Sequence, residues 1–522
     1  MSIIKNYKHF LLVLIIFLFS TSVNFYYGLI GVFPLDSFLS FDTGYKFING
    51  ELPFRDFWTP FGFTLDLFQG LIFKLFGVSW YNYLFHSSLL NFFLALSTFY
   101  VLNKFNVKLT YSFFFSLILS VISYPVSATP FLDHHSVIFS LFMMYCFILH
   151  LKTDKNFYLI FAPIFFSLAF LSKQTPSAYI LVCLSIVGIF YLIFNFSIIK
   201  ILNLFLGTII VLILFFLYFF INDISLISFW YQYVLFPLTI GDIRLNSDFL
   251  FPLEFNRVVT RFKIIHLSLV PILISIFFDL RQKFKIFYDK DFYIKFSVIL
   301  FSYSLIFHQL LTLNQKYIFM IIPVNLAFSY IFSKDFKFKY INKFLLFIGL
   351  ATVIYYKISY LDNRKFMELE DVNLNNAENA KTIHPNFQSL KWITPEYKNN
   401  PSLEIKKLRD IFTILNSENR NVIILTHYQF FSALLNKKNF FTLSKTYTYD
   451  SISLPKKNEK YFLNYKQFVF SKIKRNKINI IYIIGTDINS LIINDLFGKD
   501  CLKILKENEI LKQYDISKCQ NY

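Results

Sequence analysis

Long apolar runs alternate with short polar connections along roughly the first 360 residues of the chain. About 20 consecutive apolar residues suffice to cross the hydrocarbon core of a bilayer as a helix. A shorter run, 65–77, holds Asp66 and Lys74, and we expect it to form an amphipathic helix in the membrane interface. The longer runs predict eleven membrane-spanning helices, at residues 10–30, 81–103, 110–127, 134–151, 157–172, 177–195, 201–221, 262–279, 292–312, 316–333 and 342–360.

Lysine and arginine gather in every second connection between these runs. Cytoplasmic loops carry such an excess of positive charge, so the alternation predicts an orientation. Lys5 and Lys8 then lie inside, on an uncleaved first helix, because no small-residue cleavage site follows it. With an odd number of spans, everything after about residue 359 is expected on the outer side of the membrane.

From about residue 361 the composition changes to a tail rich in Lys, Asn and Glu. The segments 421–426 (NVIILT) and 478–484 (INIIYII) predict buried strands, each followed by a helix-like stretch. We therefore expect a polytopic α-helical membrane part at 1–360, with its first extracytoplasmic loop at 33–80. A linker at 361–400 and an extracytoplasmic α/β domain at 401–522 follow.

Two of the four cysteines, Cys501 and Cys519, lie in this tail. In an oxidising compartment a disulfide between them would stabilise the domain by about 3 kcal/mol, and two unpaired thiols are the alternative. The chain has 522 residues, of which 56% are hydrophobic, and a net charge of +19. Because most of the basic residues before the tail lie in connections between spans, we expect membrane lipid as a partner and no nucleic acid.

The first loop and the ends of the spans that face the same side carry the candidate chemistry. Ionisable groups near membrane depth are costly, so a cluster of them indicates a site. Acids of the loop, Asp36 and Asp42 among them, are candidates for a general base. Guanidinium and ammonium groups bind phosphate oxygens, and the candidates for this role are Lys173, Arg244, Arg257, Arg261 and Lys316.

Asp42, Gly44-Tyr45, the P-F-R-D-F-W stretch at 53–58 and the P-F-G at 60–62 resemble the first extracytoplasmic loop of GT-C glycosyltransferases. The bacterial relatives include the protein mannosyltransferase, aminoarabinose transferase and RgtA/B/C/D-like groups. The F-L-S-K-Q-T segment at 170–175 is similar to a helix-end motif of these enzymes. Eleven spans with an external C-terminal domain also match their layout.

The resemblance implies inverting transfer of a sugar from a polyprenyl-phosphate donor to an acceptor at the outer membrane face. Asp42 matches the catalytic acid best and Asp36 is second. The family often has Glu directly after this Asp, where Thr43 stands here, so the base and any divalent cation stay open. No cofactor is predicted, and the acceptor is a lipid, a polysaccharide or a protein. The residues expected to bind substrate are Lys173, Gln174, Arg55, Asp56, Arg244, Arg257, Arg261 and Lys316.

Each assignment has a structural alternative. Asp42 is a residue type that caps helices, Arg55 and Asp56 suit a local ion pair, and Lys173 suits a lysine that extends from a helix end to the interface. His134 and His135 are consistent with a metal site or with an interfacial helix start.

Two other functions compete with glycosyl transfer. A flippase or transporter of lipid-linked saccharides would carry polar residues through the middle of its spans, and these interiors are apolar. A polymerase or ligase of the O-antigen type would place its site in a long late loop rather than in the first.

Overall fold

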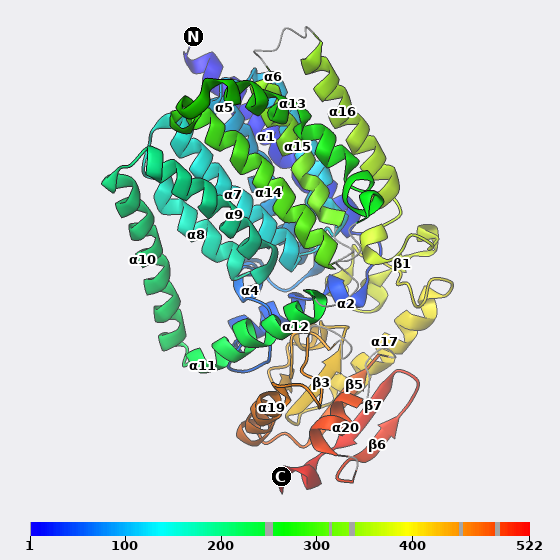
Figure 1. Cartoon of the computed structure of the whole chain (residues 1–522). Helices are drawn as coiled ribbons and strands as arrows, with labels where there is room; N and C mark the ends of the chain where they lie inside the picture. Colours follow the sequence, from blue (N-terminus) through cyan, green and yellow to red (C-terminus); the bar gives the residue numbers. More distant parts are fainter. Residues whose placement is uncertain are drawn as a thin grey trace.

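The computed structural model describes residues 2–245, 254–312, 316–333, 340–447, 453–485, 491–498 and 500–521. Within these ranges the chain forms a bundle of long helices with a small mixed sheet beyond one end (Figure 1). We call the end of the bundle next to the sheet the sheet end. The expected fold class, a polytopic helical membrane protein with a small C-terminal α/β unit, is confirmed.

Every one of the eleven predicted spans coincides with a helix. In the described residues, eight helical segments are long and apolar enough to cross a membrane, while Tyr158–Phe170 and Lys316–Phe332 are shorter apolar helices. The bundle helices are α1 (Ser2–Gly28), α5 (Trp80–Lys104), α6 (Leu109–Ile122), α7 (Leu132–Thr153), α8 (Tyr158–Phe170), α9 (Gln174–Phe194), α10 (Ile198–Ile221), α13 (Lys263–Asp279), α14 (Lys290–Thr312), α15 (Ile321–Phe332) and α16 (Ile341–Tyr356).

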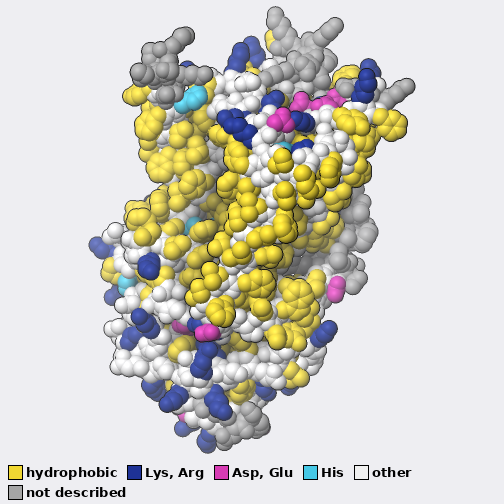
Figure 2. All heavy atoms as spheres, turned by 90° about the vertical axis from the view of Figure 1, so that its left-hand side faces the viewer, with side chains coloured by type: hydrophobic (Ala, Val, Ile, Leu, Met, Phe, Trp, Pro, Cys, Tyr) yellow, Lys and Arg dark blue, Asp and Glu magenta, His cyan; other side chains and the backbone are white. Residues whose placement is uncertain are grey.

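The position of each helix in the bundle follows from how much of it is covered. Helix α7 is central, with 83% of its span buried, whereas only 11% of the span of α10 is buried. Figure 1 shows α10 at the edge of the bundle, where it packs on α8. Gly207 of α10 permits this approach, because an added Cβ would lie 2.2 Å from the Ile160 carbonyl oxygen. The face in Figure 2 is dominated by hydrophobic side chains along the helices, as lipid contact requires.

The C-terminal unit is a five-stranded sheet in the order β4-β3-β5-β7-β6. Strands β4, β3 and β5 are parallel, and β7 and β6 continue the sheet antiparallel. Both predicted buried strands are present. The elements are α17 (Pro401–Asn416), β3 (Val422–Thr426), α18 (Phe431–Leu435), β4 (Phe440–Phe441), α19 (Phe462–Asn476), β5 (Ile480–Ile484), α20 (Leu491–Phe497), β6 (Lys503–Glu507) and β7 (Leu511–Asp515).

Successive side chains of strand β3 point to opposite faces of the sheet, so a hydrophobic core forms on each face. Ile424 packs with α17 and α18, while Ile423 and Leu425 pack with α19 and α20. The first of these two cores also takes in first-loop aromatics, including Phe38 and Phe41. The sheet unit therefore shares its core with the loop between α1 and α5.

Short helices occupy the sheet end of the bundle: α2 (Pro34–Ser37), α3 (Phe41–Ile48), α4 (Thr64–Phe76), α11 (Leu226–Phe229) and α12 (Phe236–Leu245). Helix α4 is the predicted amphipathic helix. It buries Asp66 and Phe73 and exposes Leu71 and Leu75. This one-sided burial fits a helix that lies on the bundle with its other face free for lipid.

The segment 361–400, predicted as a linker, packs closely against the first loop. Strands β1 (Glu378–Asn379) and β2 (Lys391–Trp392) pair antiparallel, and the Lys391 amide donates to the Leu29 carbonyl over 2.9 Å. The buried Arg364 guanidinium donates to the backbone carbonyls of Ile30, Pro125, Val126 and Ser127. This segment thus joins α1, the α6–α7 connection and the sheet unit into one packed region.

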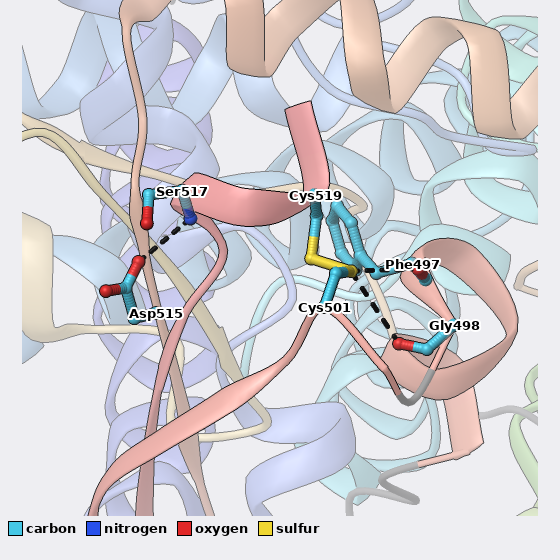
Figure 3. The surroundings of a disulfide bond; sticks show 6 residues. All are labelled: Phe497, Gly498, Cys501, Asp515, Ser517 and Cys519. Carbon is cyan, nitrogen blue, oxygen red and sulfur yellow. Dashed lines mark hydrogen bonds between the residues drawn. A yellow bond between two sulfur atoms is a disulfide. The ribbon is translucent and has the colours of Figure 1, made fainter. Parts of the chain in front are cut away.

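A disulfide joins Cys501 to Cys519 and closes the end of the sheet unit (Figure 3). It links the residues just before β6 to the short helical turn after β7, on which Cys519 is buried. The pairing expected for these two cysteines is therefore present, while Cys146 and Cys183 are free.

Candidate functional site

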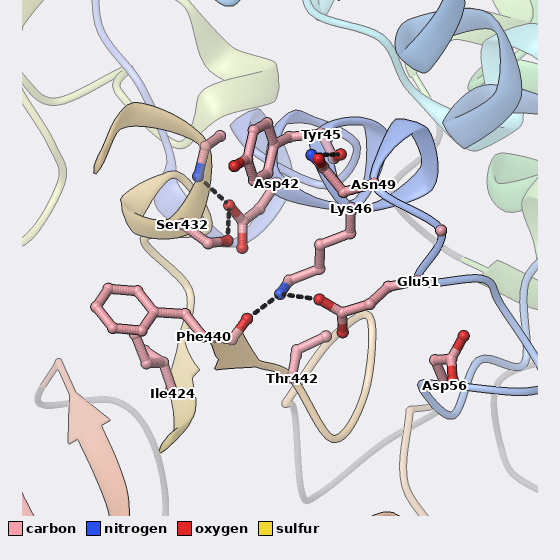
Figure 4. Close-up of polar contacts among 12 residues, drawn as sticks. Asp42, Tyr45, Lys46, Asn49, Glu51, Asp56, Ile424, Ser432, Phe440 and Thr442 are labelled. Carbon is pink, nitrogen blue, oxygen red and sulfur yellow. Dashed lines mark hydrogen bonds and ion pairs between the residues drawn. The ribbon is translucent and has the colours of Figure 1, made fainter. Parts of the chain in front are cut away.

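Asp42 lies in the first turn of α3, and the sheet unit binds its carboxylate. The hydroxyl of Ser432 and the backbone amide of Ala433, at 2.9 Å, both donate to Oδ1 (Figure 4). Burial raises the pKa of Asp42, against the opposing effect of Lys46 and the two donors. The Asp42 side chain makes no capping bond, since the N-cap position is Ser40. The space beside it measures about 20 Å³, which suits a single water rather than a sugar acceptor.

Two further first-loop acids, Glu51 and Asp56, bind basic residues of α19. Glu51 lies 3.3 Å from Lys46 Nζ and 3.6 Å from Lys472 Nζ. Asp56 pairs with Arg475, and Lys472 donates to the Asp56 backbone carbonyl. Figure 4 shows Lys46 extended between Glu51 and the Phe440 carbonyl of β4. These contacts hold the sheet unit against the loop.

Asp66 of α4 forms the most deeply buried ion pair between the two parts. Lys445 Nζ lies 2.7 and 2.8 Å from the two Asp66 carboxylate oxygens, and neither side chain is exposed. The Thr43 hydroxyl donates to the same carboxylate over 2.6 Å. The Lys445 backbone amide also donates to the Trp58 carbonyl over 3.1 Å.

Asp36 is the first-loop acid that faces open space. It lines a cavity of about 600 Å³ at the sheet end, between α2, α7, α9, α12 and the end of α14. Thr446 and Ser453 of the sheet unit form part of the wall. The Asp36 carboxylate makes no hydrogen bond or ion pair with the described residues. Burial raises the pKa of Asp36 to about 7, with Glu368 and Asp133 adding to the rise and Lys173 opposing it.

Asp133, at the start of α7, is the centre of a polar cluster in the wall of the same cavity. Lys173 Nζ lies 2.8 and 2.7 Å from its two carboxylate oxygens. The Tyr317 hydroxyl donates to Oδ1 over 3.1 Å, and His308 Nε2 lies 3.4 Å from the same oxygen. Lys173 and His308 line the cavity together with Asp133. Acid, ammonium and imidazole thus face one space from three different helix ends.

Gln174 and the Arg55–Asp56 pair have structural partners. Gln174 lines the cavity, but its amide nitrogen donates to the carbonyls of Pro60 and Tyr233 over 2.8 and 2.7 Å. Arg55 and Asp56 form the local ion pair, 2.7 Å apart, and lie outside the cavity wall. Arg55 also donates to the Asn222 carbonyl over 2.7 Å, which fixes the loop to the end of α10.

Arg257, Arg261 and Lys316 are not among the described residues that line this cavity. Arg257 donates to the Leu310 carbonyl over 3.2 Å, and Lys316 donates to the Lys365 carbonyl over 3.1 Å. Arg261 lies within electrostatic range of Lys316. The side chain of Arg244 lies outside the described residues. A phosphate role for these four residues stays a prediction.

The sequence left a metal site at His134 and His135 as an alternative. In the structure, His135 belongs to a chain of hydrogen-bonded side chains. The Tyr124 hydroxyl lies 2.7 Å from His135 Nδ1, His135 Nε2 lies 3.0 Å from His86 Nε2, and His86 Nδ1 lies 3.0 Å from the Gln69 amide oxygen. With Gln69 accepting, His86 Nδ1 donates to it, and His86 Nε2 accepts from His135 Nε2. In the described part of the chain no group of three or more His, Cys, Asp or Glu is placed to hold a metal ion.

The sequence placed Asp133 and His308 in the cluster of polar residues at the span ends but gave them no individual role, and it did not single out Lys445. Asp133 and His308 lie at ends of predicted spans on the same side as the first loop, and that position was the available signal. Nothing in the sequence near Lys445 predicts its pairing with Asp66, because 379 positions separate them. Only the packing of the sheet unit on the loop brings them together.

Neither a protein-family model nor the sequence of a curated protein matches the chain. Solved structures that are similar to it include ArnT from Cupriavidus metallidurans in the apo state, with TM-score 0.47, 9% identity and 98% of each chain covered. The same protein bound to undecaprenyl phosphate gives TM-score 0.45 and 11% identity over 97% of this chain and 98% of that one.

An oligosaccharyltransferase from Archaeoglobus fulgidus, complexed with zinc and sulfate, gives TM-score 0.43 and 14% identity over 91% of this chain and 68% of that one. These neighbours are GT-C glycosyltransferases, the group that the first loop resembles.

Proposed function

We propose that the protein transfers a sugar from a polyprenyl-phosphate donor to an acceptor hydroxyl at the outer face of a bacterial cytoplasmic membrane. The single observation that carries the proposal is the cavity at the sheet end, which is lined by Asp36, whose carboxylate binds none of the described residues, and by the Asp133–Lys173 cluster. The cavity lies where apolar spans end, which is the depth at which the headgroup of a lipid-linked substrate would be found. The motif resemblance of the first loop points to the same reaction class.

Asp36 is the general base in this proposal, in preference to Asp42. A base must reach the proton it removes, and the Asp42 carboxylate is bonded to Ser432 and Ala433 beside a space of about 20 Å³. Asp36 faces about 600 Å³ instead. A carboxylate with a pKa of about 7 is also a stronger base than an ordinary aspartate and is still ionised near neutral pH.

The transfer is a direct displacement. The acceptor oxygen attacks the anomeric carbon while its proton passes to Asp36. The bond from that carbon to the phosphate oxygen breaks, and its electron pair leaves on polyprenyl phosphate. Lys173, fixed on Asp133, places an ammonium in the cavity wall, where it can stabilise the charge that a leaving phosphate gains.

The proposal is tested by release of polyprenyl phosphate from a panel of polyprenyl-phosphate sugars. We expect release by the wild-type protein and a loss of 10²-fold or more, as is typical for removal of a general base, in Asp36→Asn. Donor binding should survive in this variant, because the carboxylate is not expected to hold the donor. Asp42→Asn is the matched control from the same loop and should retain most of its turnover.

Full turnover by Asp36→Asn together with loss in Asp42→Asn would return the base to Asp42. Movement of the lipid across a bilayer without turnover of any donor would instead support a flippase.

A further inference from the structure

The sheet unit carries an excess of positive charge along one continuous segment. From Ser453 to Gly485 the chain has eight basic residues and one acid, Glu459. Helix α17 of the same unit holds three basic residues and two acids, so the charges there nearly balance. The lower part of Figure 2, where the sheet unit lies, shows several Lys and Arg side chains and few acidic ones.

Most of these cations have no acidic partner. Lys472 Nζ lies 3.6 Å from the Glu51 carboxylate. Arg475 pairs with Asp56 of the first loop. Glu459 accepts from the Lys456 backbone amide over 2.9 Å, which leaves the Lys456 ammonium without it. The other six cations are at least partly exposed and form no ion pair with a described residue, and we call them the basic surface: Lys456, Lys457, Lys460, Lys466, Lys474 and Lys477.

The basic surface begins next to the cavity of the proposed transfer site. Ser453 lines that cavity, and its hydroxyl accepts from the hydroxyl of Thr446, which lines it too. Lys456 follows three positions later, at most about 11 Å away along an extended chain. Helix α19 then continues the segment for about 22 Å, because each of its 15 residues adds about 1.5 Å. An acceptor whose end lies in the cavity can therefore reach these cations with its adjoining units.

The rest of this surface argues against a bilayer or a protein as its partner. A helix that enters the membrane interface needs an exposed apolar face, and a protein interface needs apolar anchors at its centre. Among the described residues of 453–485, Leu463 is the one large hydrophobic side chain that is exposed. A glycan with repeated acidic groups needs mainly positive charge and hydrogen-bond donors, and lysine supplies both. The remaining apolar side chains of α19 include four that are buried against the sheet: Phe462, Tyr465, Val469 and Ile473.

We propose that the acceptor is an acidic polysaccharide and that the basic surface binds the units next to the one that receives the sugar. This inference rests on the proposed function, because it assigns an acceptor class to the same site. Ammonium groups bind the carboxylate or phosphate groups of such a chain through charge-assisted hydrogen bonds. Because these contacts are exposed to solvent, added salt weakens them.

The probe is polygalacturonate with a fluorescent end label, a glycan in which every sugar carries a carboxylate. Neutral dextran of the same length is the comparison. Binding is measured by fluorescence anisotropy with the full-length protein in nanodiscs of phosphatidylcholine, which has no net charge. We expect tight binding of polygalacturonate and little binding of dextran. Raising the salt from about 0.02 M to about 0.5 M should raise the Kd for polygalacturonate about tenfold or more, because the screening length falls from about 20 Å to about 4 Å.

A quadruple variant, Lys456→Gln/Lys457→Gln/Lys460→Gln/Lys474→Gln, removes most of the basic surface. We expect its Kd for polygalacturonate to rise about tenfold or more at low salt, since each exposed ionic contact contributes a factor of about two or more.

The matched control removes the same amount of charge from exposed lysines elsewhere on the chain beyond the bundle: Lys381→Gln/Lys398→Gln/Lys406→Gln/Lys506→Gln. Its Kd should change by less than about threefold, because only the general attraction of the net charge is reduced. Melting curves check that both variants are folded.

An equal loss of affinity in both quadruple variants, or equal binding of dextran and polygalacturonate, would overturn the acidic acceptor. Release of polyprenyl phosphate by the wild type would leave the transferase standing in that case. Binding to phosphatidylglycerol vesicles that the first quadruple variant loses, without binding of polygalacturonate, would assign the surface to the membrane and overturn the inference as well. Absence of donor release by the wild type would overturn the transferase and the acceptor together.

Discussion

At the scale of single residues, the first-loop acids differ in what surrounds each carboxylate. Asp42 accepts from Ser432 and Ala433, and Asp66 accepts from Lys445, so both are committed to holding the sheet unit. Asp36 faces the cavity with Asp133 and Glu368 as its electrostatic neighbours. The same residue type thus serves as a structural anchor at two positions and as a candidate base at a third.

The pKa of about 7 for Asp36 sets the expected pH dependence of transfer. A base acts when deprotonated, so activity should rise about tenfold per pH unit below pH 7 and level off above it. The measurement is the pH profile of donor turnover under subsaturating donor, where kcat/KM reports the free enzyme.

The stability of the fold supplies an independent control on Asp36. Its folded pKa is raised above the unfolded value, so the folded state binds the extra proton and loses stability as pH rises toward 7. Asp36→Asn should therefore melt above the wild type at about pH 8 and close to it at about pH 4. Equal melting at both values would contradict the raised pKa.

At the scale of elements, the first loop and the α8–α9 turn are fixed by a close backbone contact at Gly62. The Gly62 amide donates to the Ser172 carbonyl over 3.3 Å, and the Thr64 amide donates to the Leu171 carbonyl over 3.2 Å. A Cβ on Gly62 would lie 1.6 Å from the Leu171 carbonyl oxygen. Lys173 follows directly, so this contact sets its place on the cavity wall.

We expect Gly62→Ala to separate the loop from this turn. The clash is with backbone and cannot be relieved by a side-chain rotation, so the free energy of unfolding should fall by about 1–3 kcal/mol. Donor turnover should fall as well, because Lys173 would move relative to Asp36. The measurements are the melting temperature and kcat/KM for the donor.

Gly188→Ala in α9 is the control for an added methyl group. Nothing lies within 4 Å of its added Cβ, so the variant should melt at or slightly above the wild-type temperature, since alanine favours helix. Wild-type turnover by Gly62→Ala would show that the contact does not position the site.

At the scale of the whole molecule, the sheet unit is packed onto the first loop through buried charges. Lys445→Met would leave the Asp66 carboxylate buried without its ammonium, which costs about 3–5 kcal/mol. We expect a large drop in melting temperature and faster proteolysis of the segment 361–400. Because Thr446 lines the cavity, transfer should be lost too.

Lys445→Met/Asp66→Leu tests whether the unpaired charge is the cause. Replacing both partners by apolar side chains removes the buried charge, so most of the lost stability should return. Lys357→Met is the surface control, since the Lys357–Asp362 pair is 54% and 41% exposed and should contribute little. If the double variant is no more stable than the single one, packing around Lys445 rather than its charge would be responsible.

The orientation of the molecule is the remaining whole-molecule prediction. Reporter fusions after Lys104 and Lys200 should be cytoplasmic and a fusion after Asn400 extracytoplasmic. Because Cys501 and Cys519 form a disulfide, alkylation of the denatured protein should label two cysteines when no reductant is present. After reduction it should label all four. A cytoplasmic Asn400 fusion would contradict both the orientation and the proposed site of transfer.

The sequence alone determined the elements of this protein. Apolar length predicted each of the eleven bundle helices, because a helix in lipid must satisfy its own backbone and needs a continuous apolar run to do so. The buried strands at 421–426 and 478–484, the amphipathic helix α4 and the pairing of Cys501 with Cys519 were predicted from local pattern as well.

Only the tertiary structure decided which polar residues share a space. Lys445 and Asp66 are 379 positions apart, Asp133 and His308 are 175 apart, and no local pattern links either pair. Asp42 matched the family motif best, yet the sheet unit occupies its carboxylate and leaves Asp36 facing the cavity. Periodicity reports which face of an element is buried, whereas the partner of a buried charge depends on how distant elements pack against one another.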